Sequence, residues 1–178
     1  MTNKPKVILI AAMSIDGFIA PADKEKLPST VWTSKEDWQF FTKISKAIGT
    51  MIMGSKTFET IKRALPERQM IVMTSEPSRY AEYQAANLEF TSDSPQEILD
   101  QLAEQGVKEV ALCGGSAIYT LFMQQDLIDE LVLTVEPYVF GQGIKLFAER
   151  LDQKFSLIKQ EKLNEAGTTV SFYRKIQQ

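Results

Sequence analysis

The chain contains no histidine and a single cysteine, Cys113, among its 178 residues. Without histidine, a Ser-His-Asp triad and a His-ligated zinc site are both excluded. One cysteine can form neither an internal disulfide nor a Cys-rich metal site, so the sequence predicts no metal site and suits a reducing, cytoplasmic compartment. Acid–base chemistry therefore falls to a carboxylate, a lysine, a tyrosine or bound water.

The chain also lacks an excess of positive charge. Its 20 Lys and Arg residues face 23 Asp and Glu residues, which gives a net charge of −3. Nucleic-acid binding needs a basic face, so this balance argues against it. The apolar run at 7–13 is too short to span a bilayer, and no secretory cleavage pattern accompanies it. We expect a protein that acts on a small molecule, with neither nucleic acid nor membrane as partner.

Short apolar runs alternate with amphipathic segments through the first two-thirds of the chain. Strands are predicted at 6–12, 50–53, 69–73, 88–90, 110–113 and 130–136. Helices are predicted at 34–48, 55–63, 95–105 and 116–123, with a helical turn near 80–86. An antiparallel hairpin, 154–163 and 168–176, closes the chain, and 13–33 and 137–147 are predicted to be loops. This order predicts one α/β domain, 1–178, with a mostly parallel central sheet, helices on both faces and an antiparallel edge.

Two predicted strands stop at glycine and lead into a helix. The strand 110–113 ends at Gly114-Gly115, where Ser116 is expected to cap the following helix. Glycines let a ligand approach the backbone closely, and the N–H groups of a helix start attract phosphate. The alternative is that these glycines only make tight turns.

The second unit of this kind is the strand that ends at Gly54. Lys56 lies in the first turn of its helix, where a cation is unfavourable unless an anion binds there. Thr74-Ser75 follows a third strand, and ligands bind at the carboxyl ends of parallel strands. The three strand ends together fit a dinucleotide better than three unrelated turns.

The helix at 34–48 carries a carboxylate on its apolar face. Asp37, Phe41, Ile44 and Ile48 are spaced four, three and four residues apart and form one stripe. Glu36 lies about 100° away from that stripe. A core-facing carboxylate favours proton handling, because desolvation raises its pKa toward neutral pH. The competing interpretation is that Ser34 and Asp37 form a capping box at the helix start.

These motifs together resemble the dihydrofolate reductase superfamily along most of the chain. Five features of the sequence are similar to that family. They are the first strand with the loop after it, the Trp32–Asp37 spacing, the signature 53–61 followed by 65–68, the turn 113–119 and Thr134. The C-terminal third, from 126–131 through Pro137 and 141–147, more closely resembles the reductase domain of the riboflavin-pathway deaminase-reductase and its free-standing relatives. The deaminase half is absent, since its zinc site needs a histidine.

The resemblance implies roles for individual residues. Asp37, with a water near Trp32, would bind the substrate and support its protonation. Phe41, Arg68 and Thr134 would complete the substrate site, Arg68 at the position that holds folate's glutamate tail. The cofactor NADPH would be bound by Ala12, Ile19, Gly54, Ser55, Lys56, Thr57, Thr74, Ser75, Gly114, Gly115, Ser116, Ala117 and Ile118.

The implied function is hydride transfer from NADPH to a pterin-like or aminopyrimidine substrate. Dihydrofolate reductase proper and a non-catalytic NADPH-binding protein are the alternatives. Ser55 stands where folate reductases commonly have arginine, which leaves the preference for NADPH over NADH open. The relatives also imply a possible homodimer, and the loop 13–33 is expected to close over the nicotinamide.

Overall fold

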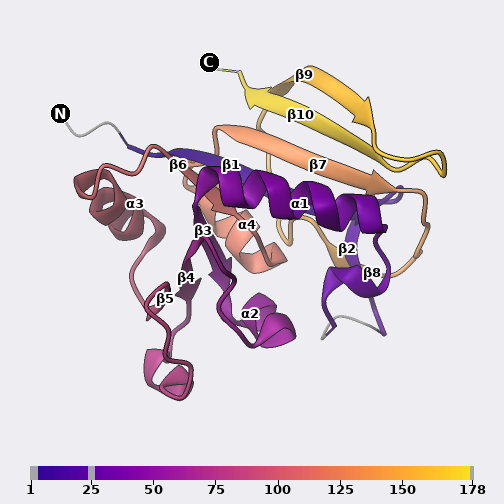
Figure 1. Ribbon diagram of the computed structural model, residues 1–178. Coiled ribbons are helices and arrows are strands. Elements are labelled where there is room, and N and C mark those ends of the chain that lie inside the picture. The colour runs from indigo at the N-terminus through magenta and orange to yellow at the C-terminus, as the bar shows by residue number, and fades with distance from the viewer. Residues whose placement is uncertain (1–3, 24–26, 177–178) are drawn as a thin grey trace.

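Eight strands form one sheet in the order β5-β4-β3-β6-β1-β7-β10-β9 (Figure 1). The structure is a computed structural model that describes residues 4–23 and 27–176. The strands are β1 (Lys6–Ser14), β3 (Thr50–Gly54), β4 (Gln69–Met73), β5 (Leu88–Thr91), β6 (Glu109–Leu112), β7 (Glu130–Glu136), β9 (Phe155–Lys162) and β10 (Thr169–Lys175). Pairing is parallel from β5 to β7 and antiparallel for β7–β10 and β10–β9. The predicted mostly parallel sheet with an antiparallel hairpin at its edge is confirmed.

Helices cover both faces of this sheet, as predicted. They are α1 (Lys35–Ile48), α2 (Ser55–Ile61), α3 (Pro95–Glu104) and α4 (Ser116–Gln124). Alternate side chains of β1 enter two different cores, because successive residues of a strand point to opposite faces. Val7 and Leu9 pack with α3 and α4. Ile8 and Ile10 pack with the apolar faces of α1 and α2.

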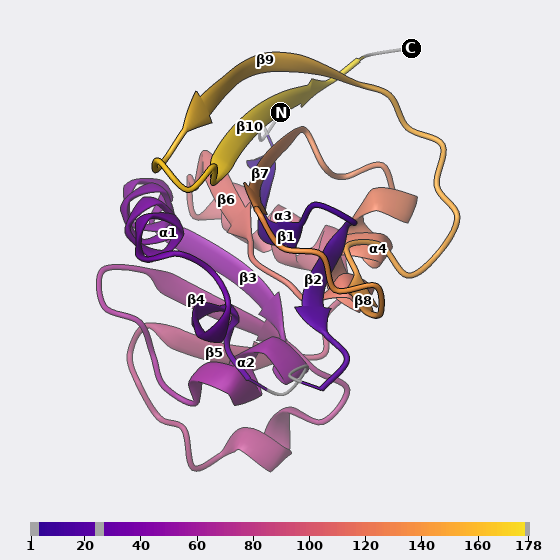
Figure 2. The ribbon, with the colours of Figure 1, turned by 90° about the vertical axis from the view of Figure 1, so that its right-hand side faces the viewer.

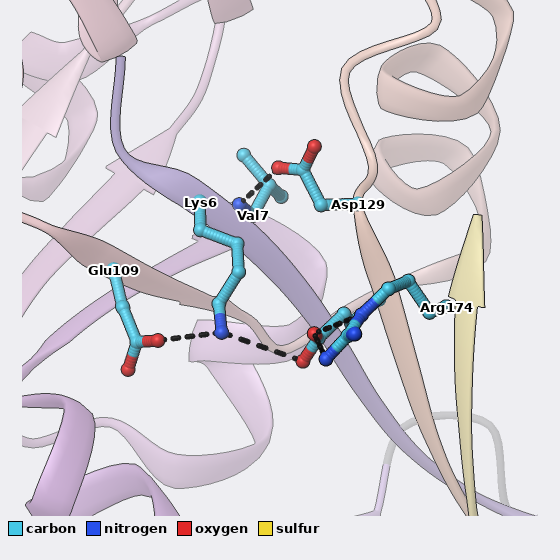
Figure 3. Close-up of polar contacts among 6 residues, drawn as sticks. Lys6, Val7, Glu109, Asp129 and Arg174 are labelled. Atoms are coloured by element: carbon cyan, nitrogen blue, oxygen red, sulfur yellow. Dashed lines mark hydrogen bonds and ion pairs between the residues drawn. The ribbon is translucent and has the colours of Figure 1, made fainter. Parts of the chain in front are cut away.

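The amino ends of β6, β1 and β7 and the carboxyl end of the antiparallel β10 carry alternating charges at one edge of the sheet. Lys6 on β1 contacts Glu109 on β6 at 2.6 Å and Glu130 on β7 at 3.5 Å. Arg174 on β10 contacts Glu130 at 3.1 Å, and the Asp129 carboxylate accepts the Val7 N–H at 2.8 Å (Figure 3). The hydrogen bond to Glu109 raises the pKa of Lys6. The charges of these residues are thus paired with one another.

The prediction that 13–33 is a loop is wrong in part. Strand β1 runs to Ser14, and a second strand, β2 (Phe18–Pro21), pairs antiparallel with β8 (Gly143–Lys145). Figure 2 shows this pair beside the main sheet. A Cβ on Gly143 would lie 2.2 Å from the Ala20 carbonyl oxygen, so only glycine allows the two backbones to meet. The sequence predicted loops at 13–33 and 137–147 because β2 and β8 are short and each depends on the other for its hydrogen bonds.

Two smaller predictions also need correction. The turn predicted near 80–86 is a 3₁₀ turn at Pro77–Tyr80. Ser116 is the first residue of α4, and Gly115 is its N-cap, without a side-chain cap. No helix within 4–23 and 27–176 is long and apolar enough to cross a bilayer.

Candidate active site

A large cleft of about 1870 Å³ opens where the parallel strands end. Almost all of the site residues predicted from the sequence line it. They are Ala12, Ile19, Asp37, Phe41, Gly54, Ser55, Lys56, Thr57, Thr74, Ser75, Gly114, Gly115, Ser116, Ala117, Ile118 and Thr134. Trp32 and Arg68 are the two that do not. The structure therefore brings together residues that are more than 120 positions apart in the sequence.

The two glycine turns lie directly against each other at one end of the cleft. The Gly54 N–H donates to the Gly114 carbonyl oxygen at 2.7 Å, which continues the pairing of β3 with β6 beyond the strands. A Cβ on Gly54 would lie 2.8 Å from Cγ1 of Ile118. Gly114 has a φ of +112°, a conformation that side chains rarely tolerate, and its peptide bond to Gly115 is cis. Glycine is needed here so that the starts of α2 and α4 can approach each other.

This end of the cleft is built to receive negative charge. No side chain caps the first turn of α4, so its N–H groups stay available, and the helix dipole favours an anion there. Lys56, exposed in the first turn of α2, lines the same end. Thr74 and Ser75, at the end of β4, add hydroxyl groups. The arrangement fits the phosphates of an extended ligand.

Asp37 lies on the cleft wall at the start of α1 and is only 6% exposed. Burial raises the pKa of this carboxyl, while the hydroxyls of Thr134 and Thr33 lower it and the negative charge of Glu136 raises it further. The predicted placement of a desolvated carboxylate is confirmed. A carboxyl with a raised pKa next to a cleft is suited to exchanging a proton with a bound ligand.

The start of α1 is held by a carboxylate that the sequence analysis missed. Glu136, at the end of β7, is 2% exposed. Its Oε1 accepts both the N–H and the Oγ–H of Ser34, each at 2.7 Å. Ser34 in turn accepts the Asp37 N–H at 3.1 Å, so Ser34 is the cap, as predicted. The capping-box interpretation is wrong in one respect. The carboxylate that accepts the hydrogen bonds of Ser34 belongs to Glu136 and not to Asp37.

Trp32 and Arg68 lie outside the cleft lining. The Trp32 ring, 7% exposed, packs edge-on against Phe140 with centroids 5.0 Å apart. Arg68 is 5% exposed, and its Nε and Nη1 atoms find no hydrogen-bond acceptor in the described part of the chain. Burial lowers the pKa of Arg68. Neither side chain contacts the cleft in this conformation.

Two other groups near the cleft are unsuited to catalysis. Burial raises the pKa of the Cys113 thiol to about 12, so this cysteine is not a thiolate nucleophile at neutral pH. The Tyr119 hydroxyl donates to the Ile10 carbonyl oxygen at 2.7 Å, and burial raises its pKa well above the ordinary value. Of Asp37, Cys113 and Tyr119, Asp37 is therefore the group suited to proton exchange with a bound ligand.

The segment that closes one side of the cleft is tied down by Asp16. Its carboxylate accepts the Ser14 hydroxyl at 2.6 Å and the Gly141 N–H at 2.7 Å. These bonds, that from Ser14 first, lower the pKa of Asp16. They hold the turn after β1 against the loop before β8, so β2 and β8 present Ile19 and Ile144 to the cleft.

Several lining residues were not predicted. Lys62 and Arg63 follow α2, Lys145 belongs to β8, and Trp38 follows Asp37 on α1.

Glu136, which lies outside the lining, could have been found from one signal in the sequence. Val132, Thr134 and Glu136 alternate along β7, so two polar side chains point to the same face of the sheet as a core residue. The lysines and arginine carried no such signal, because solvated cations are common at helix ends.

The fold and the cleft define an α/β protein with its cleft at the carboxyl ends of the parallel strands. The family model described as dihydrofolate reductase matches residues 6–176, and the chain belongs to this family. It is 31% identical to the dihydrofolate reductase of Aedes albopictus over 169 residues, covering 88% of this chain and 86% of that protein.

Two solved structures share its fold. The putative riboflavin biosynthesis protein of Shewanella sp. PV-4 superposes with a TM-score of 0.74 at 23% identity, covering 97% of this chain and 99% of that one. Dihydrofolate reductase from Enterococcus faecalis, complexed with NADP(H), gives 0.72 at 25% identity and 97% of each chain. The chain is a reductase of the dihydrofolate reductase type.

Proposed function

We propose that the protein transfers a hydride from NADPH to a pterin-like or aminopyrimidine substrate, of the type reduced in riboflavin synthesis. One observation carries the proposal: a buried carboxylate, Asp37, and an anion-binding pair of glycine turns lie on one continuous cleft. A reductase of this kind needs a proton source near the substrate and a holder for a phosphate-bearing cofactor.

In this proposal the cofactor is held at the strand ends. The pyrophosphate fits between Gly54–Thr57 and Gly114–Ile118, where the two backbones meet and the helices α2 and α4 begin. Lys56, Thr74 and Ser75 take the adenosine phosphate, and backbone groups of Ala12 and Ile19 take the carboxamide. NADPH, when bound, supplies the hydride, and the protein supplies position and a proton.

The substrate ring is assigned to the wall formed by α1 and β7. Asp37 bonds to the amino-pyrimidine edge, Phe41 packs on the ring and Thr134 supports the Asp37 carboxylate. Trp32 remains in the proposal as the residue near the water that supports protonation with Asp37, although its ring packs against Phe140 in this conformation. Arg68 remains as a tail-binding residue only if its side chain turns out of its present buried position, and Lys62 and Arg63 already line the cleft in its place.

The test is NADPH oxidation, followed by absorbance, with dihydrofolate and with 5-amino-6-(5-phosphoribosylamino)uracil in parallel. We expect turnover of the aminouracil. Turnover of dihydrofolate alone would favour the dihydrofolate reductase alternative and a role for Arg68. Tight NADPH binding without turnover of either substrate would contradict catalysis on these compounds and favour a non-catalytic NADPH-binding protein.

Lys56 tests the cofactor assignment separately. Lys56→Ala removes one charge-assisted contact to phosphate, so NADPH affinity should fall roughly tenfold. NADH affinity should stay the same if Lys56 contacts the 2′-phosphate. Lys43→Ala, an exposed lysine on α1 that does not line the cleft, is the control. Equal losses for both cofactors would assign Lys56 to the pyrophosphate instead.

A homodimer also belongs to the proposal, by analogy with the deaminase-reductase relatives. Analytical ultracentrifugation across a tenfold range of concentration tests it. A constant monomer mass would contradict it without affecting the reductase assignment.

A further inference from the structure

Glu136 is a buried carboxylate for which the proposed reaction has no direct use. It is 2% exposed and does not line the cleft. All of its recorded partners are neutral donors. They are the Ser34 N–H and Oγ–H on Oε1 and the Thr168 hydroxyl on Oε2, each at 2.7 Å. No cation contacts it among residues 4–23 and 27–176. Burying an unpaired charge is costly, so its retention calls for an explanation.

The contacts of Glu136 lead to Asp37 in two steps. The Ser34 hydroxyl donates a hydrogen bond to Glu136. The oxygen of the same hydroxyl is then free to accept the Asp37 N–H at 3.1 Å. Thr134 and Glu136 lie two residues apart on β7 and therefore on the same face, the one that α1 covers. Glu136 fixes the end of the helix while Thr134 lies near the Asp37 carboxyl. The strand thus sets where along the sheet the first turn of α1 begins.

A second chain segment keeps Glu136 in place. Thr168, 1% exposed, begins the return of the C-terminal hairpin. Asn164 bonds to the Thr168 hydroxyl at 2.9 Å and to the Glu36 carboxylate at 3.3 Å. The hairpin turn, the end of β7 and the start of α1 therefore form one hydrogen-bonded unit, whose members are ordered together.

We propose that Glu136 is the positioning residue of this site: through Ser34 it fixes the first turn of α1 and holds a negative charge behind the Asp37 carboxyl. This inference rests on the proposed function for its catalytic consequence, and on geometry alone for its structural one. Thr33 and Thr134 also act on Asp37, and Glu59, Lys62 and Arg63 line the cleft on α2 or just after it. Glu136 is the contributor whose removal changes the charge without opening the cleft.

The first experiment reads Asp37 directly and needs no substrate. Protein labelled with ¹³C at aspartate carboxyls is titrated by NMR, with Asp37→Asn used to assign the signal. In Glu136→Gln the titration midpoint of Asp37 should shift to lower pH, because a neighbouring negative charge is gone. An unchanged or higher midpoint would overturn the proposal.

The matched control is Glu97→Gln. Glu97 accepts the N–H and Oγ–H of Ser94, the N-cap of α3, at 2.8 and 2.7 Å, so it repeats the chemistry at another helix. It does not line the cleft. The Asp37 midpoint should stay unchanged in this variant. An equal shift in both variants would indicate a general effect of net charge and overturn the assignment.

If Glu136→Gln does not fold, Ser34→Gly breaks the same connection, since glycine is tolerated at an N-cap. The Asp37 amide should then lose protection from hydrogen exchange, and its full retention would overturn the proposal. With a substrate in hand, kcat for Glu136→Gln should fall about tenfold with NADPH affinity unchanged, as expected for a misplaced group. A wild-type protein with no turnover would contradict the proposed function, while the titration would still decide the role of Glu136.

Discussion

The first turns of α1 and α3 contain the same three hydrogen bonds, yet they are completed by different parts of the chain. In α3 the N–H and hydroxyl of the serine cap, Ser94, donate to Glu97 in the same turn, which is an ordinary capping box. In α1 the N–H and hydroxyl of the serine cap, Ser34, donate to Glu136, 102 residues away. Because Glu136 accepts these bonds, the side chain at the third position of α1 is not needed for capping. Asp37 occupies that position and points its carboxyl to the cleft wall.

The comparison shows how a helix start can be both stable and functional. A local capping box uses its acid for stability and leaves it exposed. At α1 the stabilising acid and the cleft-facing acid are separate residues on separate elements. The consequence is that stability and chemistry should respond to different mutations at α1, whereas Glu97 at α3 should affect stability alone.

The largest expected effect is on turnover. Asp37→Asn should reduce hydride transfer by about a hundredfold, because the proton donor is lost. NADPH affinity should change little, since Asp37 lies away from the phosphate end. Glu97→Gln, its positional counterpart on α3, should leave both quantities unchanged. Stopped-flow measurement of NADPH binding and oxidation separates the two, and equal losses in binding and turnover would contradict the assigned role.

The next effect is on the free energy of unfolding. Ser34→Ala should cost about 2 kcal/mol, since it removes a cap and also a donor to a buried carboxylate. Ser94→Ala should cost only about 1 kcal/mol, the usual value for an exposed cap. Urea unfolding of both variants without cofactor measures the difference. A larger loss at Ser94 would show that the remote carboxylate adds nothing to the cap.

The smallest effect is on the pH dependence of the free energy of unfolding, to which Asp37 and Glu97 should contribute with opposite signs. Burial first, then Glu136, raises the folded-state pKa of Asp37 above its ordinary 3.8, so this residue destabilises the fold increasingly as the pH rises above 3.8. Asp37→Asn should therefore be more stable than the wild type at neutral pH and equal to it in acid. Hydrogen bonds from Ser94 lower the pKa of Glu97 below its ordinary 4.5. Its stabilising effect is complete above 4.5 and disappears as the pH falls through the lowered value.

Unfolding free energies of Asp37→Asn and Glu97→Gln, each subtracted from the wild type between pH 3 and 7, test this opposition. The two differences should have opposite signs at pH 7 and converge toward zero in acid. Differences of the same sign at pH 7 would mean that Asp37 is not desolvated in solution.

The sequence predicted most of what local pattern controls. The parallel strands, the four helices and the hairpin follow from periodicity and glycines. All but two of the predicted site residues line the cleft, and most of those positions came from the family resemblance. The pair β2–β8 was missed because neither segment is stable alone, and only a backbone contact at Gly143 joins them. Glu136 was missed because its partner lies on another element, and Arg68 was predicted to meet a ligand although the fold buries it.

The outermost strand, β9, has consequences for solubility. It ends the sheet, and its backbone edge has no partner strand in the described chain. Leu157 and Ile158 are more than half exposed, at 55% and 52%. Such an edge can recruit identical chains into fibrous aggregates. Lys159, Glu161 and Lys162 follow in the same strand and act as gatekeepers. We expect substitution of these charged residues by apolar ones to promote aggregation at this edge, even in a protein whose core is packed as before.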